Sequence, residues 1–186
     1  ASGQLIIGST TEIAGDYVPY FQNGAADYDI YNLTGGNSGY PTVDMTSDGQ
    51  FVINKTVVKE DKVTTNDDGS KTYTFTIKKG LKWNDGSEIT AADYVATAML
   101  WSSKVVGDMG ADNSVIAKYF KGWADFSQGK SKVFTGVNLI DEDTFAVTID
   151  AEYLPFFYEL ALTSLAPTKL SFWLDDQVTI KDDGDG

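Results

Sequence analysis

The sequence predicts a mixed α+β fold, in which a sheet built from β-hairpins is packed by helices. Polar and apolar residues alternate over residues 73–77 (YTFTI), the period of two expected of a strand with one buried face. The NDG at residues 84–86 predicts a tight turn after that strand. Thr90, with Asp93 three residues later, predicts a capped helix start, and apolar residues follow at helical spacing.

Before this segment the chain carries a short apolar run and a stretch rich in tyrosine. Residues 5–7 (LII), bounded by glycines, predict a buried strand. A helical turn is predicted over residues 27–33, and the glycine-rich residues 35–39 predict a loop. Large aromatic residues lie among Asn, Gly and Asp between residues 17 and 40, a mixture typical of a ligand-binding surface.

Two β-hairpins and three helices are predicted in the remainder of the chain. The first hairpin spans residues 57–77 and turns at the Asp-Gly of residues 66–70, and the second spans residues 133–149 and turns at an acidic stretch. The predicted helices are a continuous one over residues 90–106, a second over residues 114–126 and a third from Pro155 through Leu162.

The composition excludes several classes of protein. The chain has 186 residues and 42% hydrophobic content, enough for a core. Its formal net charge of −13, from 27 acidic and 14 basic residues, would repel nucleic acid and anionic membrane surfaces, so we expect no nucleic-acid partner. The absence of histidine and cysteine removes imidazole catalysis, thiolate chemistry and zinc ligation, and we expect no metal and no cofactor.

Carboxylate pairs are a route to catalysis that this composition leaves open, since glycosidases need only two suitably spaced acidic side chains. The closely spaced acids are at residues 67–68, 141–143, 175–176 and 182–183, in predicted turns or in the acidic tail. We interpret them as solvated turn residues and predict that the chain is not an enzyme. A carboxylate-dependent hydrolase is the alternative of another class.

Residues 73–93 resemble the signature region of the extracellular solute-binding proteins that serve oligopeptide and dipeptide ABC importers (family 5). In that family a strand reading YTFxLRxG leads into KWxDGxPxTAxD and a helix. The chain has YTFTI at residues 73–77, then Gly80, KWNDG at residues 82–86 and TAAD at residues 90–93.

A second stretch resembles the same family. Residues 136–137 (GV), 143–148 (DTFAVT) and 155–158 (PFFY) are similar to the family's DDxTFxVxL strand and the PxFxxxL helix after it. The chain departs from the family at residues 87–89 (SEI), where a turn with proline is usual, and at Lys79, where Arg or Glu is frequent. Neither departure changes a residue with an obvious chemical role.

The resemblance implies a periplasmic-binding-protein-like lobe, part of a two-lobe cluster C type protein. We expect residues 1–40 to begin lobe I with a ligand-facing segment and residues 41–165 to form the family-specific subdomain of lobe I. Residues 166–186 are expected to start the connection towards a missing remainder and to end in a flexible acidic tail. The chain is thus expected to be an N-terminal fragment that binds ligand weakly when isolated.

The resemblance also implies a function. Members capture an oligopeptide or another small solute between two lobes and deliver it to an ABC permease in the membrane. An extracytoplasmic location is implied, in the periplasm or at the outer face of the cell membrane, with a lipid anchor as an option in the full-length protein. We expect a monomer. An oligosaccharide receptor of the same family is the alternative, because aromatic faces stack on sugars.

Two groups of residues are candidates for the site. The family's first lobe contributes an extended segment to the ligand, and its expected position here is Tyr20, Phe21, Gln22 and Asn23. A peptide there would be held by backbone hydrogen bonds as an added strand. Packing into a core is the competing interpretation of the aromatic residues.

The second group is the structural signature of the family. It consists of Trp83, Asp85, Gly86, Thr90 and Asp93. We expect these residues to form a turn and to cap the helix that follows, with no direct contact to ligand.

Overall fold

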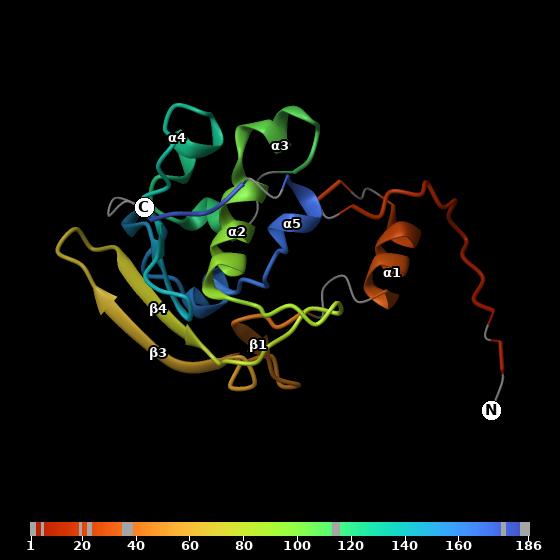
Figure 1. Cartoon of the computed structure of the whole chain (residues 1–186), viewed down its shortest axis with the longest axis horizontal. Helices are drawn as coiled ribbons and strands as arrows, with labels where there is room; N and C mark the ends of the chain where they lie inside the picture. The colour runs from red at the N-terminus through yellow and green to blue at the C-terminus, as the bar shows by residue number, and fades with distance from the viewer. Residues whose placement is uncertain are drawn as a thin grey trace. The chain divides into compact units, whose positions relative to one another are not determined.

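The computed structural model of the chain divides into two compact units, Ala1–Gly39 and Tyr40–Gly186, which are described one at a time (Figure 1). Across both units the structure describes residues 3–4, 6–18, 20–21, 24–34, 39–112, 116–175 and 178–182.

The first unit contains helix α1 (Ala25–Leu33), which confirms the predicted helical turn and begins two residues earlier. The buried strand predicted at residues 5–7 is wrong where the structure describes it. Ile6 and Ile7 are 82% and 68% exposed and belong to no strand, because no described segment of this unit pairs with them. Leu5 and most of the predicted loop, residues 35–38, lie outside the described residues.

The second unit is built on a four-stranded antiparallel sheet with the order β3-β4-β6-β5. Both predicted hairpins are confirmed, although the first strand of the second hairpin is shorter than predicted. Strand β4 pairs with β6 from Lys71 opposite Ile149 to Thr76 opposite Thr144. The strands of this sheet are β3 (Val58–Thr65), β4 (Lys71–Ile77), β5 (Val137–Leu139) and β6 (Thr144–Ile149), and a separate two-stranded sheet holds β1 (Val43–Met45) and β2 (Phe51–Ile53).

The core of this unit lies between the sheet and helix α2 (Ala91–Ser102), which packs against β5 and β6 (Figure 1). The alternation predicted for β4 is confirmed, because the side chains of Tyr73, Phe75 and Ile77 are buried. Phe145 of β6 stacks on Tyr94 of α2 at 5.2 Å between ring centroids and meets Phe75 at 5.6 Å. This aromatic stack fixes the helix on the sheet.

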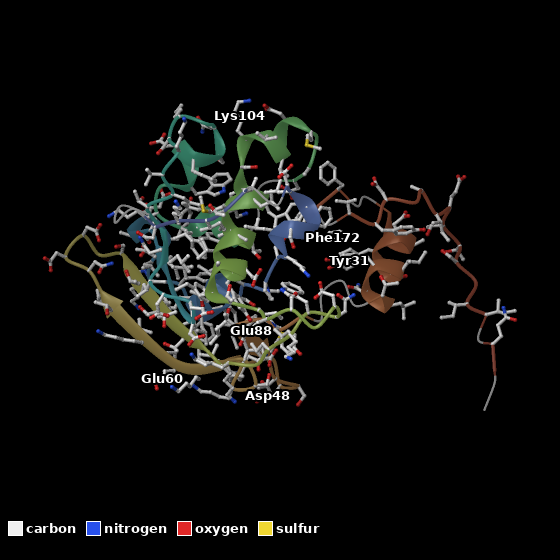
Figure 2. The ribbon with its side chains drawn as sticks, in the orientation of Figure 1. Tyr31, Asp48, Glu60, Glu88, Lys104 and Phe172 are labelled. Carbon is white, nitrogen blue, oxygen red and sulfur yellow. The ribbon has the colours of Figure 1, made fainter. Side chains whose placement is uncertain are left out.

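Strand β3 is one edge of the sheet, and nearly all its side chains are exposed. Charged residues of both signs, Lys59, Glu60, Asp61 and Lys62, occupy its middle, and Figure 2 shows Glu60 at the outer side of the strand. Charges on an edge strand oppose pairing with a strand of another chain.

The helix predicted over residues 90–106 is two helices, because Ser103 interrupts it. Helix α2 ends at Ser102, and Ser103 has extended backbone angles. The Ser103 side chain accepts a hydrogen bond from the backbone N–H of Val106 and so caps α3 (Lys104–Asp108). The local preference of serine for a cap outweighs the continuing apolar pattern.

The helix predicted over residues 114–126 is also broken. Its described part consists of a 3₁₀ helix η1 (Ile116–Tyr119) and a short α4 (Trp123–Ser127), while residues 113–115 lie outside the described residues. Between them Phe120 forms a β-bridge with Ile149, and Gly122 adopts a φ of 80°. Pairing with β6 therefore overrides the helical spacing of the aromatic residues.

The helix predicted from Pro155 is wrong at its start and in its type. Residues 155–158 are not helical, and the 3₁₀ helix η3 runs over Glu159–Thr163. The hydrogen bonds in and before η3 join residues three apart, as in a 3₁₀ helix. Glu159 N–H donates to the Phe156 carbonyl, and Ala161 N–H donates to the Tyr158 carbonyl. The remaining short helices are η2 (Ala151–Tyr153) and α5 (Leu170–Trp173).

No helix within the described part of the chain is long and apolar enough to cross a membrane.

Candidate functional site

The loop before the tyrosine-rich segment of the first unit is held by the buried side chain of Asp27, in the first turn of α1. Its Oδ1 accepts hydrogen bonds from the backbone N–H groups of Gly15 (2.7 Å) and Asp16 (3.2 Å), and Oδ2 accepts one from Ala14 (3.1 Å). Three consecutive amides of the preceding loop are therefore folded back onto the start of α1.

The surroundings of Asp27 favour its ionised form. The hydrogen bond from Ala14 is the largest influence, and with those from Gly15 and Asp16 it outweighs desolvation and holds the pKa of Asp27 below its ordinary value of 3.8. A side chain at position 24 would disturb this arrangement, since a Cβ on Gly24 would lie 2.6 Å from Asp27 Oδ2.

Tyr20 lies in this segment in a conformation that L-residues seldom adopt. Its φ is 66°, in the left-handed region, and strain of this kind is concentrated at functional sites. Partial burial, together with the neighbouring hydroxyls of Tyr31 and Tyr28, raises the pKa of Tyr20 to about 12. The rings of Tyr28 and Tyr31 are 6.1 Å apart on α1, where Figure 2 labels Tyr31. Three tyrosines thus gather in one unit.

The structure describes two of the four residues predicted to contact ligand. Tyr20 is 39% exposed, and the backbone N–H of Phe21 donates to the Val18 carbonyl at 3.2 Å, which closes a turn. Gln22 and Asn23 lie outside the described residues. The ligand-binding role of the four residues stays a prediction.

We expect Asp27→Asn to release residues 14–16 from α1. An asparagine amide nitrogen cannot accept the N–H of Ala14, and the charge that strengthens the other two hydrogen bonds is lost. Amide hydrogen exchange at residues 14–16, followed by NMR at neutral pH, should become roughly tenfold faster or more. The wild-type protection should be complete above pH 3.8 and should fall as the pH drops through the lower pKa of the folded state, because that pKa is depressed.

Asp29→Asn is the matched control for this experiment. Asp29 is an exposed residue of the same helix, so its replacement removes the same charge without touching the three amides. Unchanged protection in Asp27→Asn, or an equal loss in Asp29→Asn, would show that the carboxylate does not hold the loop.

The family-signature residues of the second unit form a tight turn. The N–H of Gly86 donates to the Trp83 carbonyl at 3.0 Å, and Gly86 has a φ of 87°, which favours glycine. Asp85 Oδ1 accepts from the backbone N–H and the hydroxyl of Ser87, at 3.0 and 2.7 Å.

The same turn is tied to a distant part of the chain. Lys169 forms an ion pair with Asp85 and donates to the hydroxyl of Ser87. The hydrogen bond from Lys169, followed by those from Ser87, holds the pKa of Asp85 well below its usual range. The turn is therefore anchored beside residues 166–169, which run along α2, where Thr168 N–H donates to the Asp93 carbonyl.

Thr90 is the N-cap of α2, and Asp93 lies three residues into the helix. Asp93 Oδ2 accepts from the Thr90 backbone N–H at 2.8 Å and from its hydroxyl at 3.3 Å. These bonds place the pair at the helix start, in the geometry of a capping box.

Sequence reasoning missed Asp27 and Lys169. An acidic residue in a first helical turn was visible in the sequence, but its partners are backbone amides at positions 14–16, which carry no side-chain signal. The partner of Lys169 is more than eighty residues away. Over the described ranges, no group of three or more His, Cys, Asp or Glu residues could hold a metal ion.

Comparison with known protein families tests the resemblance that the sequence suggested. Residues 56–185, more than half of the chain, match the profile of the bacterial extracellular solute-binding proteins, family 5 Middle. The chain belongs to this family. The resemblance drawn from the signature region and from the second stretch is thereby confirmed.

Relatives of the family 5 chain come from several bacteria. It is 32% identical over 94 residues to the periplasmic oligopeptide-binding protein OppA of Escherichia coli (strain K12), a match that covers 49% of the chain and 17% of that protein. It is 31% identical over 96 residues to the dipeptide-binding protein DppE of Bacillus subtilis (strain 168), over 51% of the chain and 17% of that protein. The chain thus spans less than a fifth of the length of these relatives.

Solved structures share the fold of the family 5 chain. Listeria monocytogenes OppA bound to peptide matches 84% of the chain with a TM-score of 0.63 and 22% identity, and the match covers 28% of that protein. Haemophilus influenzae OppA in complex with RPPGFSPFR matches 86% of the chain with a TM-score of 0.62 and 22% identity, and covers 30% of that protein. The predicted α+β lobe of a periplasmic binding protein is confirmed.

Proposed function

We propose that the chain is part of a solute receptor for an ABC importer, with oligopeptides as its ligands. The match of residues 56–185 to family 5 carries this proposal. Relatives named for oligopeptide and dipeptide binding support the ligand class. The receptor captures its ligand between two lobes and passes it to the membrane permease, by binding and hinge closure without bond chemistry.

The ligand segment in this proposal is Tyr20, Phe21, Gln22 and Asn23. A peptide beside it is held by main-chain hydrogen bonds, which tolerate many side chains. Two observations support this choice: the strained backbone of Tyr20, and the anchoring of the preceding loop by Asp27. A loop fixed before the ligand arrives loses less conformational entropy on binding.

The proposed receptor works as a monomer outside the cytoplasm. The family description names extracellular proteins, and one relative is periplasmic. Attachment to the outer face of the membrane by a lipid is compatible with this role. The division of the chain into residues 1–40, 41–165 and 166–186 belongs to the same proposal, with the middle part as the family-specific subdomain.

Native mass spectrometry after gentle purification tests this function, on the chain and on any longer protein that its gene encodes. We expect a ladder of co-purified masses that fragment as short peptides, bound more weakly by the isolated chain because one lobe forms only half of a cleft. Masses spaced by one hexose would replace the peptide assignment with an oligosaccharide receptor.

Two tyrosine variants control for the position of the ligand. Tyr20→Ala should lower peptide occupancy by up to about tenfold, the contribution of one aromatic contact. Tyr153→Ala removes a ring of similar exposure in the second unit and should leave occupancy unchanged. Equal occupancy in wild type and Tyr20→Ala would move the ligand away from this segment.

A further inference from the structure

A pocket of about 380 Å³ opens on the second unit, between β2, β3, β4 and the residues that lead into η3. Its volume is within the range of small-molecule sites, roughly 300–1,000 Å³. Four aromatic and two acidic side chains are the main features of its lining: Phe51, Tyr73, Phe157, Tyr158, Asp61 and Glu159. The pocket lies entirely in one compact unit and includes no residue of the predicted ligand segment and none of the five signature residues.

The aromatic rings of this pocket stand at steep angles to one another. The Tyr158 ring meets Phe157 at 4.7 Å and 88°, and meets Phe51 at 5.6 Å and 73°. Because these rings are nearly perpendicular, one small group placed between them can contact more than one ring. Phe157 is 88% exposed, so a large apolar surface faces solvent at this point.

The two carboxylates are held in fixed positions. Glu159 Oε1 accepts from the Tyr73 hydroxyl at 2.6 Å and from Lys71 Nζ at 2.7 Å, and Asp61 Oδ1 accepts from Lys55 Nζ at 2.7 Å. Desolvation raises the pKa of Glu159, but the hydrogen bonds from Lys71 and Tyr73 outweigh it and leave the pKa below its usual value. Glu159 is therefore ionised at neutral pH.

Both acidic side chains can accept a further donor. A carboxylate offers about four acceptor positions, more than these hydrogen bonds use. No lysine is among the described residues that line the pocket. Glu159 and Asp61 each already pair with one lysine, so a cation would use the acceptor positions that remain, whereas an apolar occupant would remove water from those positions.

We propose that this pocket binds an organic cation, an alkylammonium or guanidinium group, between the rings of Phe51, Phe157 and Tyr158 and the carboxylates of Asp61 and Glu159. The faces of aromatic rings attract cations, and quaternary ammonium groups are bound in cages of this composition. The site needs neither a second lobe nor a bound peptide. Its failure and the failure of the proposed function are therefore distinguishable.

Titration of the 186-residue chain with choline, followed by saturation-transfer NMR at low salt and neutral pH, tests the proposal. The neutral compound 3,3-dimethylbutanol has the same shape without the charge. We expect saturable binding of choline that is at least about fivefold tighter than that of 3,3-dimethylbutanol. Equal affinities would overturn the proposal, because the pocket would then be merely apolar.

Two phenylalanine variants locate the binding. Phe157→Ala should weaken choline binding by about three- to tenfold. Phe172→Ala is the matched control, because Phe172 on α5 is also highly exposed (75%) and does not line the pocket (Figure 2). Both side chains lie outside the core, so both variants should fold. Choline binding that is unchanged in Phe157→Ala contradicts the assignment.

Asp61→Asn should weaken the binding of choline but not the binding of 3,3-dimethylbutanol.

A second ligand distinguishes the source of the cation. The blocked tripeptide acetyl-Gly-Arg-Gly-amide presents a guanidinium on a peptide, whereas choline is a free small cation. Tighter binding of the tripeptide supports recognition of an arginine side chain, and tighter binding of choline supports a small metabolite. Absence of saturable binding for both would overturn the proposal.

Discussion

Replacing Phe145 by alanine is expected to lower the free energy of unfolding by about 3–5 kcal/mol. Phe145 is fully buried between Phe75 of β4 and Tyr94 of α2, at ring centroid distances of 5.6 and 5.2 Å. Alanine would leave a cavity at the contact that joins the sheet to the helix. Because domains are stable by only about 5–15 kcal/mol, such a loss removes a large part of the total.

Urea unfolding followed by circular dichroism measures this effect. Phe172→Ala is the matched control, since it deletes the same side chain from an exposed position and should change the free energy of unfolding by less than about 0.5 kcal/mol. A loss below about 1 kcal/mol for Phe145→Ala would mean that the aromatic stack does not hold the unit together.

Replacing Gly136 by alanine is expected to destabilise the chain by about 3 kcal/mol, the upper end of the range for overpacking. A Cβ on Gly136 would lie 2.5 Å from the carbonyl oxygen and 2.6 Å from the backbone nitrogen of Lys121. These backbone atoms cannot turn aside, because Lys121 N–H donates to the Thr148 carbonyl and Thr148 N–H donates to the Gly136 carbonyl. The added methyl group would therefore push residues 121 and 136 apart and weaken the hydrogen bonds that both make with Thr148 of β6.

Thermal unfolding of Gly136→Ala beside Gly8→Ala measures this prediction. A Cβ on Gly8 would meet no heavy atom of the described residues within 4 Å, and Gly8 lacks a positive φ, so alanine should be neutral or slightly stabilising there. A melting temperature for Gly136→Ala equal to that of the wild type would show that the backbones are not in close contact.

The sequence predicted those elements whose patterns are local and strong. The alternation of residues 73–77, the Asp-Gly turn before it and the capped start at Thr90 all have causes within a few residues, and the structure contains each of them. The helix over residues 114–126 failed because Phe120 pairs with Ile149, a partner nearly thirty residues away. Spacing alone cannot reveal such a long-range competitor.

The candidate sites show the same division. The family signature was recognisable because its turn and cap are encoded by adjacent residues. The anchor at Asp27 depends on backbone amides, and the aromatic pocket joins Phe51 to residues 157–159, which lie about a hundred positions further along the chain. The exposure of Phe157 could not be inferred either, because an aromatic residue after proline fits a buried helix equally well.

The strand order β3-β4-β6-β5 constrains how the chain folds as it is synthesised. Hairpin β3–β4 is complete by Ile77, but the next neighbour of β4 is β6, where Thr76 pairs with Thr144. Until the ribosome has released residues 144–149, Phe75 lacks the ring of Phe145 that covers it. Closing the long loop between β4 and β6 costs conformational entropy before the contacts between the two strands form. An apolar strand that is not yet covered is prone to aggregation. We therefore expect this unit to fold late, with β4 open to chaperones while about seventy further residues are synthesised.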